Sequence, residues 1–239
     1  QELLERLFAQ RRVVLQHAQV HWHDRFAGES AVLDDIEFAL DSAGRRHRVS
    51  LRAPVLPGLA SDVDLAVEFR RPPFAGTGDW RKWQGEIRIG AAELDLATLA
   101  QRWQRRGVAA APGVTVRAGQ ARLRGWSHFE AGALVDGFLD LAADEIDADL
   151  DGRALPLRTL AAEAQARRQP VGSTRADFPV LRVSDAQGWS LTASHEGSKL
   201  VLSPQGAPVA ARLALDRFEA AEVAKLLGRL PLPEALRAS

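Results

Sequence analysis

Apolar and polar residues alternate with a period of two along much of the N-terminal half of the chain. The segments 17–23, 36–41, 48–53, 63–70 and 87–89 each place an apolar side chain at every second position. Successive side chains of a β-strand point to opposite faces, so this pattern predicts strands that are apolar on one face and polar on the other. The apolar positions that we single out are Val20, Trp22, Ile36, Phe38, Leu40, Val49, Leu51, Val63, Leu65, Val67 and Phe69.

The alternation returns in the C-terminal half, where it is less regular. It predicts strands in 114–123, 135–141 and 146–150, and further strands between residues 160 and 217. The fold class that we predict is mainly β with a few short α-helices. The strands are expected to form an antiparallel meander, a curved, groove-like sheet with one apolar side, in two repeats.

Three segments have apolar residues at helical spacing, namely 2–10, 93–105 and 218–229. Asp95 stands where its side chain can cap the first turn of the second helix. The second and third helices each follow a run of predicted strands, which indicates a weak internal repeat. We therefore predict two units: residues 1–112, with the N-terminal helix and a closing helix at 93–105, and residues 113–239, with a closing helix at 218–229.

Composition excludes several classes of protein. The 31 basic residues (Lys and Arg) balance 31 acidic residues, so no charge surplus favours nucleic acid as a partner. Cysteine is absent, which excludes disulfides, thiolate metal sites and cysteine nucleophiles. No segment has the roughly 18–20 uncharged apolar residues of a membrane-spanning helix. The chain begins with Gln1 and contains no methionine, and we expect it to be a piece of a longer protein.

The segment 17–24 contains three histidines and an aspartate. On a strand, His21 and His23 share a face, and this H-x-H spacing is one that zinc sites use. His17 lies on the same face but about 13 Å away, too far to share the ion. A ligand from another strand is also missing, because alternation places His47 on the apolar side. We interpret these histidines as the polar face of a strand, and we predict no metal site.

No motif in the sequence favours an enzyme. Residues 147–152 match the start of a calcium loop, D-x-D-x-D-G, but the twelfth position is Arg158 instead of the required glutamate. The chain has no G-x-S-x-G elbow, no G-x-G-x-x-G and no P-loop. We expect neither catalysis nor a cofactor. Trp126 stands among polar residues and is the tryptophan best placed for an exposed role, whereas Trp22 and Trp103 are expected to pack on apolar faces.

Several segments together resemble the YhdP-type, AsmA-like proteins of Gram-negative bacteria. They are RVVLQHAQVHWHD (12–24), AGRRHRVSLRA (43–53), DWRKWQGEI (79–87), ELDLATLAQRW (93–103), the strand set 119–150 and LGRLPLP (227–233). The resemblance implies a periplasmic segment of a protein that is anchored in the inner membrane through a helix outside this chain. It also implies a β-groove that moves phospholipid between the inner and outer membranes.

Two interpretations of the apolar positions remain open at this point. As a lipid groove, they would hold phospholipid acyl chains, and other segments of the same long chain would be partners. Alternatively, they form the closed core of a structural or protein-binding periplasmic β module that has no ligand.

Overall fold

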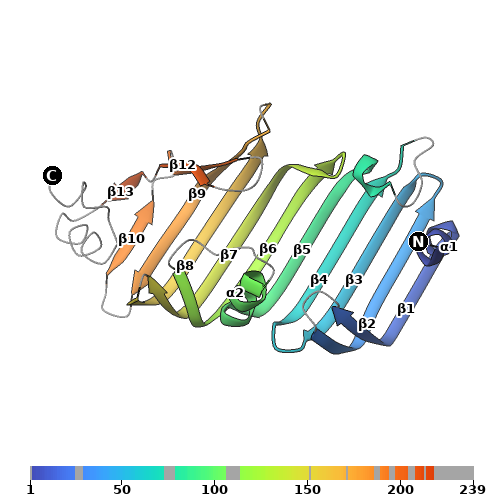
Figure 1. The fold of residues 1–239 in the computed structure, drawn as a ribbon, viewed down its shortest axis with the longest axis horizontal. Coiled ribbons are helices and arrows are strands. Elements are labelled where there is room, and N and C mark those ends of the chain that lie inside the picture. The colour runs from blue at the N-terminus through green and yellow to red at the C-terminus, as the bar shows by residue number, and fades with distance from the viewer. Residues whose placement is uncertain are drawn as a thin grey trace.

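The structure is an open antiparallel sheet with short helices at its margins (Figure 1). The computed structural model describes residues 2–24, 29–72, 79–105, 114–150, 152–170, 172–185, 189–193, 197–203, 208–212 and 214–217. Within these residues the sheet has 13 strands. The fold class predicted from the sequence, mainly β with few helices in one open, curved meander, is confirmed.

The first nine strands follow one another along the sheet, each hydrogen-bonded to the next. Their bounds are β1 Arg12–Asp24, β2 Glu29–Ala43, β3 Arg46–Leu56, β4 Ala60–Arg70, β5 Gln84–Asp95, β6 Val114–Glu130, β7 Ala133–Leu150, β8 Arg153–Arg168 and β9 Thr174–Asp185. Tight turns suffice for such a meander. Between β6 and β7, for example, Ala131 and Gly132 both have positive φ, as a two-residue hairpin turn requires.

The last four strands form two short strand pairs that lie side by side beyond β9. They are β10 Ser190–Ala193, β11 Lys199–Leu202, β12 Pro208–Arg212 and β13 Leu215–Arg217. Both β10 and β11 pair with β9, at its C-terminal and N-terminal halves respectively. In turn, β13 pairs with β10 and β12 pairs with β11. The sheet therefore ends in β1 on one side and in short strands on the other (Figure 1).

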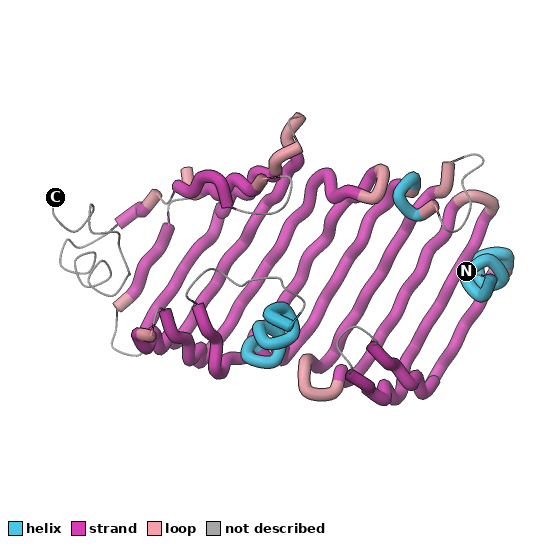
Figure 2. Tube along the Cα trace, in the orientation of Figure 1, coloured by secondary structure: helices cyan, strands magenta, loops and turns pink. Residues whose placement is uncertain are grey.

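Two of the three predicted helices lie in the described residues (Figure 2). They are α1 Glu2–Ala9 and α2 Leu96–Arg105, and a 3-10 turn, η1 Trp80–Lys82, precedes β5. The predicted cap is confirmed, because the backbone N–H of Thr98 donates to Asp95 Oδ1 at 2.7 Å. The predicted helix at 218–229 and the segment 227–233 lie outside the described residues.

The predicted boundary between two units, at residues 112 and 113, falls between α2 and β6. Strand pairing continues across it, since β5 pairs with β6 from Gln84↔Glu130 to Asp95↔Gln120. One continuous sheet therefore contains strands of both predicted units.

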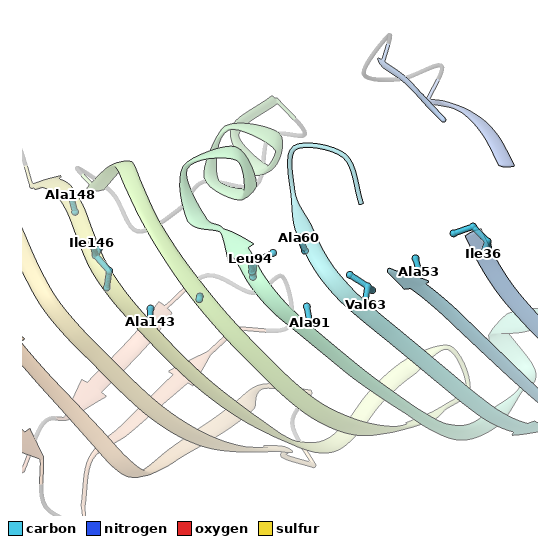
Figure 3. Packing of buried hydrophobic residues seen from close by; sticks show 10 residues of the cluster. Ile36, Ala53, Ala60, Val63, Ala91, Leu94, Ala143, Ile146 and Ala148 are labelled. Atoms are coloured by element: carbon cyan, nitrogen blue, oxygen red, sulfur yellow. The ribbon is translucent and has the colours of Figure 1, made fainter. Parts of the chain in front are cut away.

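A line of β-bulges crosses the sheet near one end of its strands, and we call this line the crease. Asp35, Asp62, Glu93 and Glu145 lie on it with φ between 44° and 58°, in the left-handed region that non-glycine residues seldom adopt. Register shifts mark the same places: Ser61 pairs with Ala92 but Asp64 pairs with Gly90, so two residues of β4 face one of β5. Bulges bend the strands that carry them. The strands accordingly curve in Figure 3.

The buried core follows the crease. It consists of Ile36, Ala53, Ala60, Val63, Ala91, Leu94, Ala121, Ala143, Ile146 and Ala148, which lie in a row across neighbouring strands on the inner side of the curve (Figure 3). Six of these ten residues are alanine, because side chains converge inside a bend and leave little room. Leu96 and Leu99 of α2 pack against this row. Gly119 fits beneath α2, since a methyl group there would lie 3.2 Å from Leu96 Cδ1.

Candidate functional site

The candidate site is the apolar face of the sheet, on the same side as the buried core. Directly opposed residues of an antiparallel pair point to the same face, so the pairing register shows which side chains stand together. Two rows cross β2 to β5 in this way. One row is Leu40–Val49–Val67–Ile87, and the other is Phe38–Leu51–Leu65–Ile89.

The apolar face continues across the second half of the sheet. From β5 to β9, one row runs Ala91–Leu123–Leu141–Ala162–Leu181. Beside it, Ile89 is followed by Gly125, Leu139 and Ala164. The side chains become smaller toward β8, but neither of these two rows contains a charged residue.

No second layer of described residues covers the middle of this face. Ile89 in β5 is 39% exposed and Leu139 in β7 is 40% exposed, although each has neighbouring strands on both sides. A second sheet packed on this face would bury such central aliphatic side chains almost completely. Helix α2 covers the crease, and the apolar rows beyond it remain accessible.

The predicted groove residues fall into three groups. Ile36 and Val63 are buried in the crease, and Leu40 and Phe69 are buried near the opposite ends of their strands. These four residues are core in the folded chain. Half-buried on the accessible face are Phe38, Val49, Leu51, Leu65 and Val67. Val20 is 38% exposed near the end of β1, and Trp22 lies in β1 with a side chain outside the described residues.

Sequence reasoning did not single out Ile87, Ile89, Leu139 and Leu141, which extend the same rows. The signal was present, because the first pair alternates along β5 and the second pair alternates along β7. The missing information was the register that joins these strands to β4 and β8.

An aromatic cluster closes one corner of the apolar face. Phe8 of α1 contacts His47, Phe69 and Trp83 edge-on, with ring centroids 5.2, 5.6 and 5.8 Å away. Phe69 and Trp83 are stacked, with centroids 4.5 Å apart and planes within 3°. Offset aromatic pairs of this kind add to the hydrophobic contribution. The cluster fixes α1 to the ends of β3 and β4.

His47 is the buried polar member of this cluster, with 0% of its surface exposed. Arg71 Nε donates to its Nε2 at 2.9 Å, so in the neutral ring the proton is on Nδ1, which lies 2.9 Å from Ser42 Oγ. Burial lowers the pKa of His47 below 6.5, and the charge of Arg71 lowers it further. As predicted, His47 lies on the apolar side, and it acts there as a satisfied core residue.

The opposite face of the sheet is polar and rich in ion pairs. Arg48 donates to Glu68 at 2.8 Å, and His128 lies between Asp136 at 2.6 Å and Glu86 at 3.3 Å. The hydrogen bond with Asp136 raises the pKa of His128, and the Glu86 charge adds to the effect. Trp126 is on this face, 39% exposed and 5.0 Å from the His128 ring. The two faces therefore differ sharply in polarity, as the alternation predicts.

The histidine-rich strand holds local pairs. His17 Nδ1 is 2.5 Å from Asp35 Oδ1, and this hydrogen bond raises the pKa of His17. Both residues have positive φ, so His17 continues the crease into β1. His23 Nδ1 is 2.7 Å from Ser30 Oγ. Among the described residues no group of three His, Asp or Glu side chains is arranged to hold a metal ion. The calcium-like segment lies largely in β7, where Arg117 donates to Asp149 at 2.8 Å.

No helix in the described part of the chain is long and apolar enough to cross a membrane. Comparison with protein-family models, with curated proteins and with solved structures found no match. The resemblance to AsmA-like proteins therefore depends on the sequence segments given above, and the site is argued from its own geometry.

Proposed function

We propose that the apolar face is a hydrophobic β-groove that holds the acyl chains of phospholipids. The observation that carries the proposal is the exposure of Ile89 and Leu139, 39% and 40%, in the middle of a sheet whose apolar face has no second layer among the described residues. Each methylene group that moves from water onto such a surface contributes about 0.8 kcal/mol. An acyl chain placed across several strands would therefore bind through many small, non-directional contacts.

The proposal assigns contacts to residues on the accessible rows. From the predicted set these are Phe38, Val49, Leu51, Leu65 and Val67, and the register adds Ile87, Ile89, Leu139 and Leu141. The crease, with α2 above it, would bound the groove along one side. The ion-paired opposite face would stay in water.

In the setting that the sequence resemblance implies, this chain is a periplasmic segment of an AsmA-like protein in a Gram-negative envelope. Other segments of the same long chain would continue the groove, and a segment outside this one would attach it to the inner membrane. The chain would then carry phospholipid between the inner and outer membranes without catalysing a reaction.

The test is native mass spectrometry of the purified chain, which we expect to retain phospholipid. Ile89→Asp with Leu139→Asp should lower lipid occupancy about tenfold or more, because a carboxylate would be desolvated against acyl chains. Both side chains are partly exposed, so the variant is expected to fold. The control is Ala66→Asp, on the polar face of β4 between Ser50 and Arg88.

Two results would count against the groove. One is a lipid-free wild-type chain that also fails to take up phospholipid from detergent. The other is a protein segment found packed over Ile89 and Leu139, which would favour a structural module with a closed core.

A further inference from the structure

A small hollow lined by arginines lies at the C-terminal ends of β2 and β4 and the N-terminal end of β3. It has a volume of about 570 Å3 and is lined by Ala43, Arg45, Arg46 and Arg70. We call it the arginine hollow. Its frame is rigid, because Ala43 pairs with Arg46, Arg46 pairs with Arg70, and the N–H of Arg71 donates to the Arg45 carbonyl at 2.9 Å.

The pairing of Arg46 with Arg70 departs from the charge pattern of the polar face. Like charges directly opposite each other in an antiparallel pair are destabilising. In the next row of the same strands, Arg48 opposes Glu68 and the two form a 2.8 Å hydrogen bond. The row of Arg48 and Glu68 pairs opposite charges, whereas the row of Arg46 and Arg70 pairs two positive charges.

One carboxylate, Glu68, lies beside the hollow, and Glu86, Glu130 and Asp136 line a neighbouring hollow that Arg46 and Arg70 also border. Glu68 lies 3.4 Å from Arg46, but Arg48 shares it. The two arginines together hold the pKa of Glu68 below its usual range, with the Arg48 hydrogen bond as the larger cause. Within the described part of the chain, Arg45 and Arg70 have no side-chain partner. The next carboxylate along the chain, Asp79, lies 3.1 Å from Lys82.

We infer that the arginine hollow binds a phosphate group. Guanidinium forks match the oxygens of phosphate in charge and geometry, and several arginines at one edge can each donate to a single anion. A bound phosphate would also remove the repulsion between Arg46 and Arg70. An extended polyanion fits less well, because Glu86 and Asp136 follow on the same face.

The phosphate could belong to a lipid headgroup or to a small phosphate ester. Arg46 and Arg70 are each one residue from the apolar face, since their neighbours His47 and Phe69 point to it. The aromatic cluster covers His47 and Phe69, so a phospholipid whose chains lie on the accessible rows would place its headgroup in the hollow by passing around that cluster at the strand ends. This assignment to a lipid rests on the proposed function, whereas the phosphate site itself depends only on the arginines.

The first experiment titrates the 15N-arginine-labelled chain with inorganic phosphate at low ionic strength, with chloride as the reference anion. We expect phosphate to shift the Nε–Hε signals of Arg45, Arg46 and Arg70. The double variant Arg46→Gln, Arg70→Gln should weaken binding about tenfold or more, because charge-assisted hydrogen bonds are lost. Arg52→Gln, in β3, is the control. Arg70→Gln alone should raise the melting temperature in the absence of phosphate.

The second experiment loads the chain with phosphatidylglycerol or with diacylglycerol that has the same acyl chains. If the double variant loses its preference for phosphatidylglycerol but keeps diacylglycerol, the headgroup is the source of the phosphate. If phosphate binds and neither lipid is retained, the site stands while the proposed groove fails. Unshifted arginine signals, or binding that the double variant retains, would overturn the site.

Discussion

His17, His47 and His128 show how neighbouring residues set the protonation of one residue type. The hydrogen bond that His17 donates to Asp35 raises the pKa of His17, and the one that His128 donates to Asp136 raises the pKa of His128. Burial instead lowers the pKa of His47, which lies against Arg71 and has no carboxylate partner in the described part of the chain. Relative to an ordinary histidine, His17 and His128 hold their proton more strongly and the buried His47 holds it less strongly.

His47 should therefore make the fold sensitive to acid. Its pKa is lowered from 6.5, so its contribution to stability is complete above that value and is lost as the pH falls through the folded-state pKa. His17 and His128 act in the opposite sense, because stability linked to a raised pKa is lost as the pH rises. We expect an NMR titration to give a midpoint below 6.5 for His47 and above 6.5 for the other two. In urea unfolding, His47→Gln should lose less stability than wild type between about pH 7 and pH 5. A His47 midpoint at or above 6.5 would contradict this interpretation.

At the scale of elements, the long strands explain which sequence predictions were incomplete. The alternation predicted separate strands at 114–123, 135–141 and 146–150, whereas β6 and β7 run unbroken through them. The reason is the crease, because a bulge shifts the alternation by one residue without ending the strand. The helix predicted from residue 93 likewise begins at Leu96, and Glu93 is a bulge residue of β5.

The crease has a sequence signature that alternation alone does not reveal. Asp35, Asp62, Glu93 and Glu145 are each followed by a branched apolar residue and then by a second acidic residue. The first acidic residue takes the left-handed conformation, and the apolar residue after it enters the buried row. Asp tolerates this conformation better than most residues, whereas Glu and branched side chains are strained there.

Substitution of Glu145 should test the conformational role of the crease. Glu145→Gly should preserve or slightly increase stability, because glycine accepts a φ of 50° without strain. Glu145→Val should cost about 1 kcal/mol or more in the free energy of unfolding. Ser50→Gly and Ser50→Val, in a regular part of β3, are the matched controls. There the valine variant should be the more stable of the two. Urea denaturation measures all four variants, and the same order at both positions would argue against a strained crease.

At the scale of the whole molecule, contacts between strands are almost entirely between sequence neighbours. From β2 to β8 each strand pairs only with the one before and the one after it, and the sheet has no second layer in the described residues. Stability in such an array is close to a sum of neighbour terms. Damage to one pair of strands should therefore stay local.

Gly85→Ala provides the test of this locality. A methyl group at Gly85 would lie 2.7 Å from Phe69 Cα and closer still to the carbonyl oxygen of Glu68, so the variant should lose about 1–3 kcal/mol. We expect hydrogen exchange to become faster in β4 and β5 and to stay unchanged in β8 and β9. Gly90→Ala is the control, because the three atoms nearest to its methyl group all belong to the movable carboxylate of Asp64 and not to the backbone. A uniform rise along the sheet would indicate a single cooperative core.

Taken alone, the pattern of residues determined the fold class, the helix at the N-terminus, the capped helix at Asp95 and the polarity of each strand face. These properties depend on local periodicity, and an antiparallel meander needs only contacts between neighbours in sequence. The polar environment of the histidines in 17–23 followed from the same periodicity. Periodicity did not decide whether the apolar positions form a groove or a closed core.

Tertiary structure decided which apolar positions are covered. Ile36 and Val63 have the same alternation as Leu51 and Leu65, yet the first two are buried in the crease and the others lie on the accessible face. The difference arises where bulges on adjacent strands line up and α2 packs above them. The opposition of Arg46 and Arg70 is likewise a product of register between two strands. Periodicity assigns a side chain to a face of the sheet, but only the packing of distant elements determines what lies against that face.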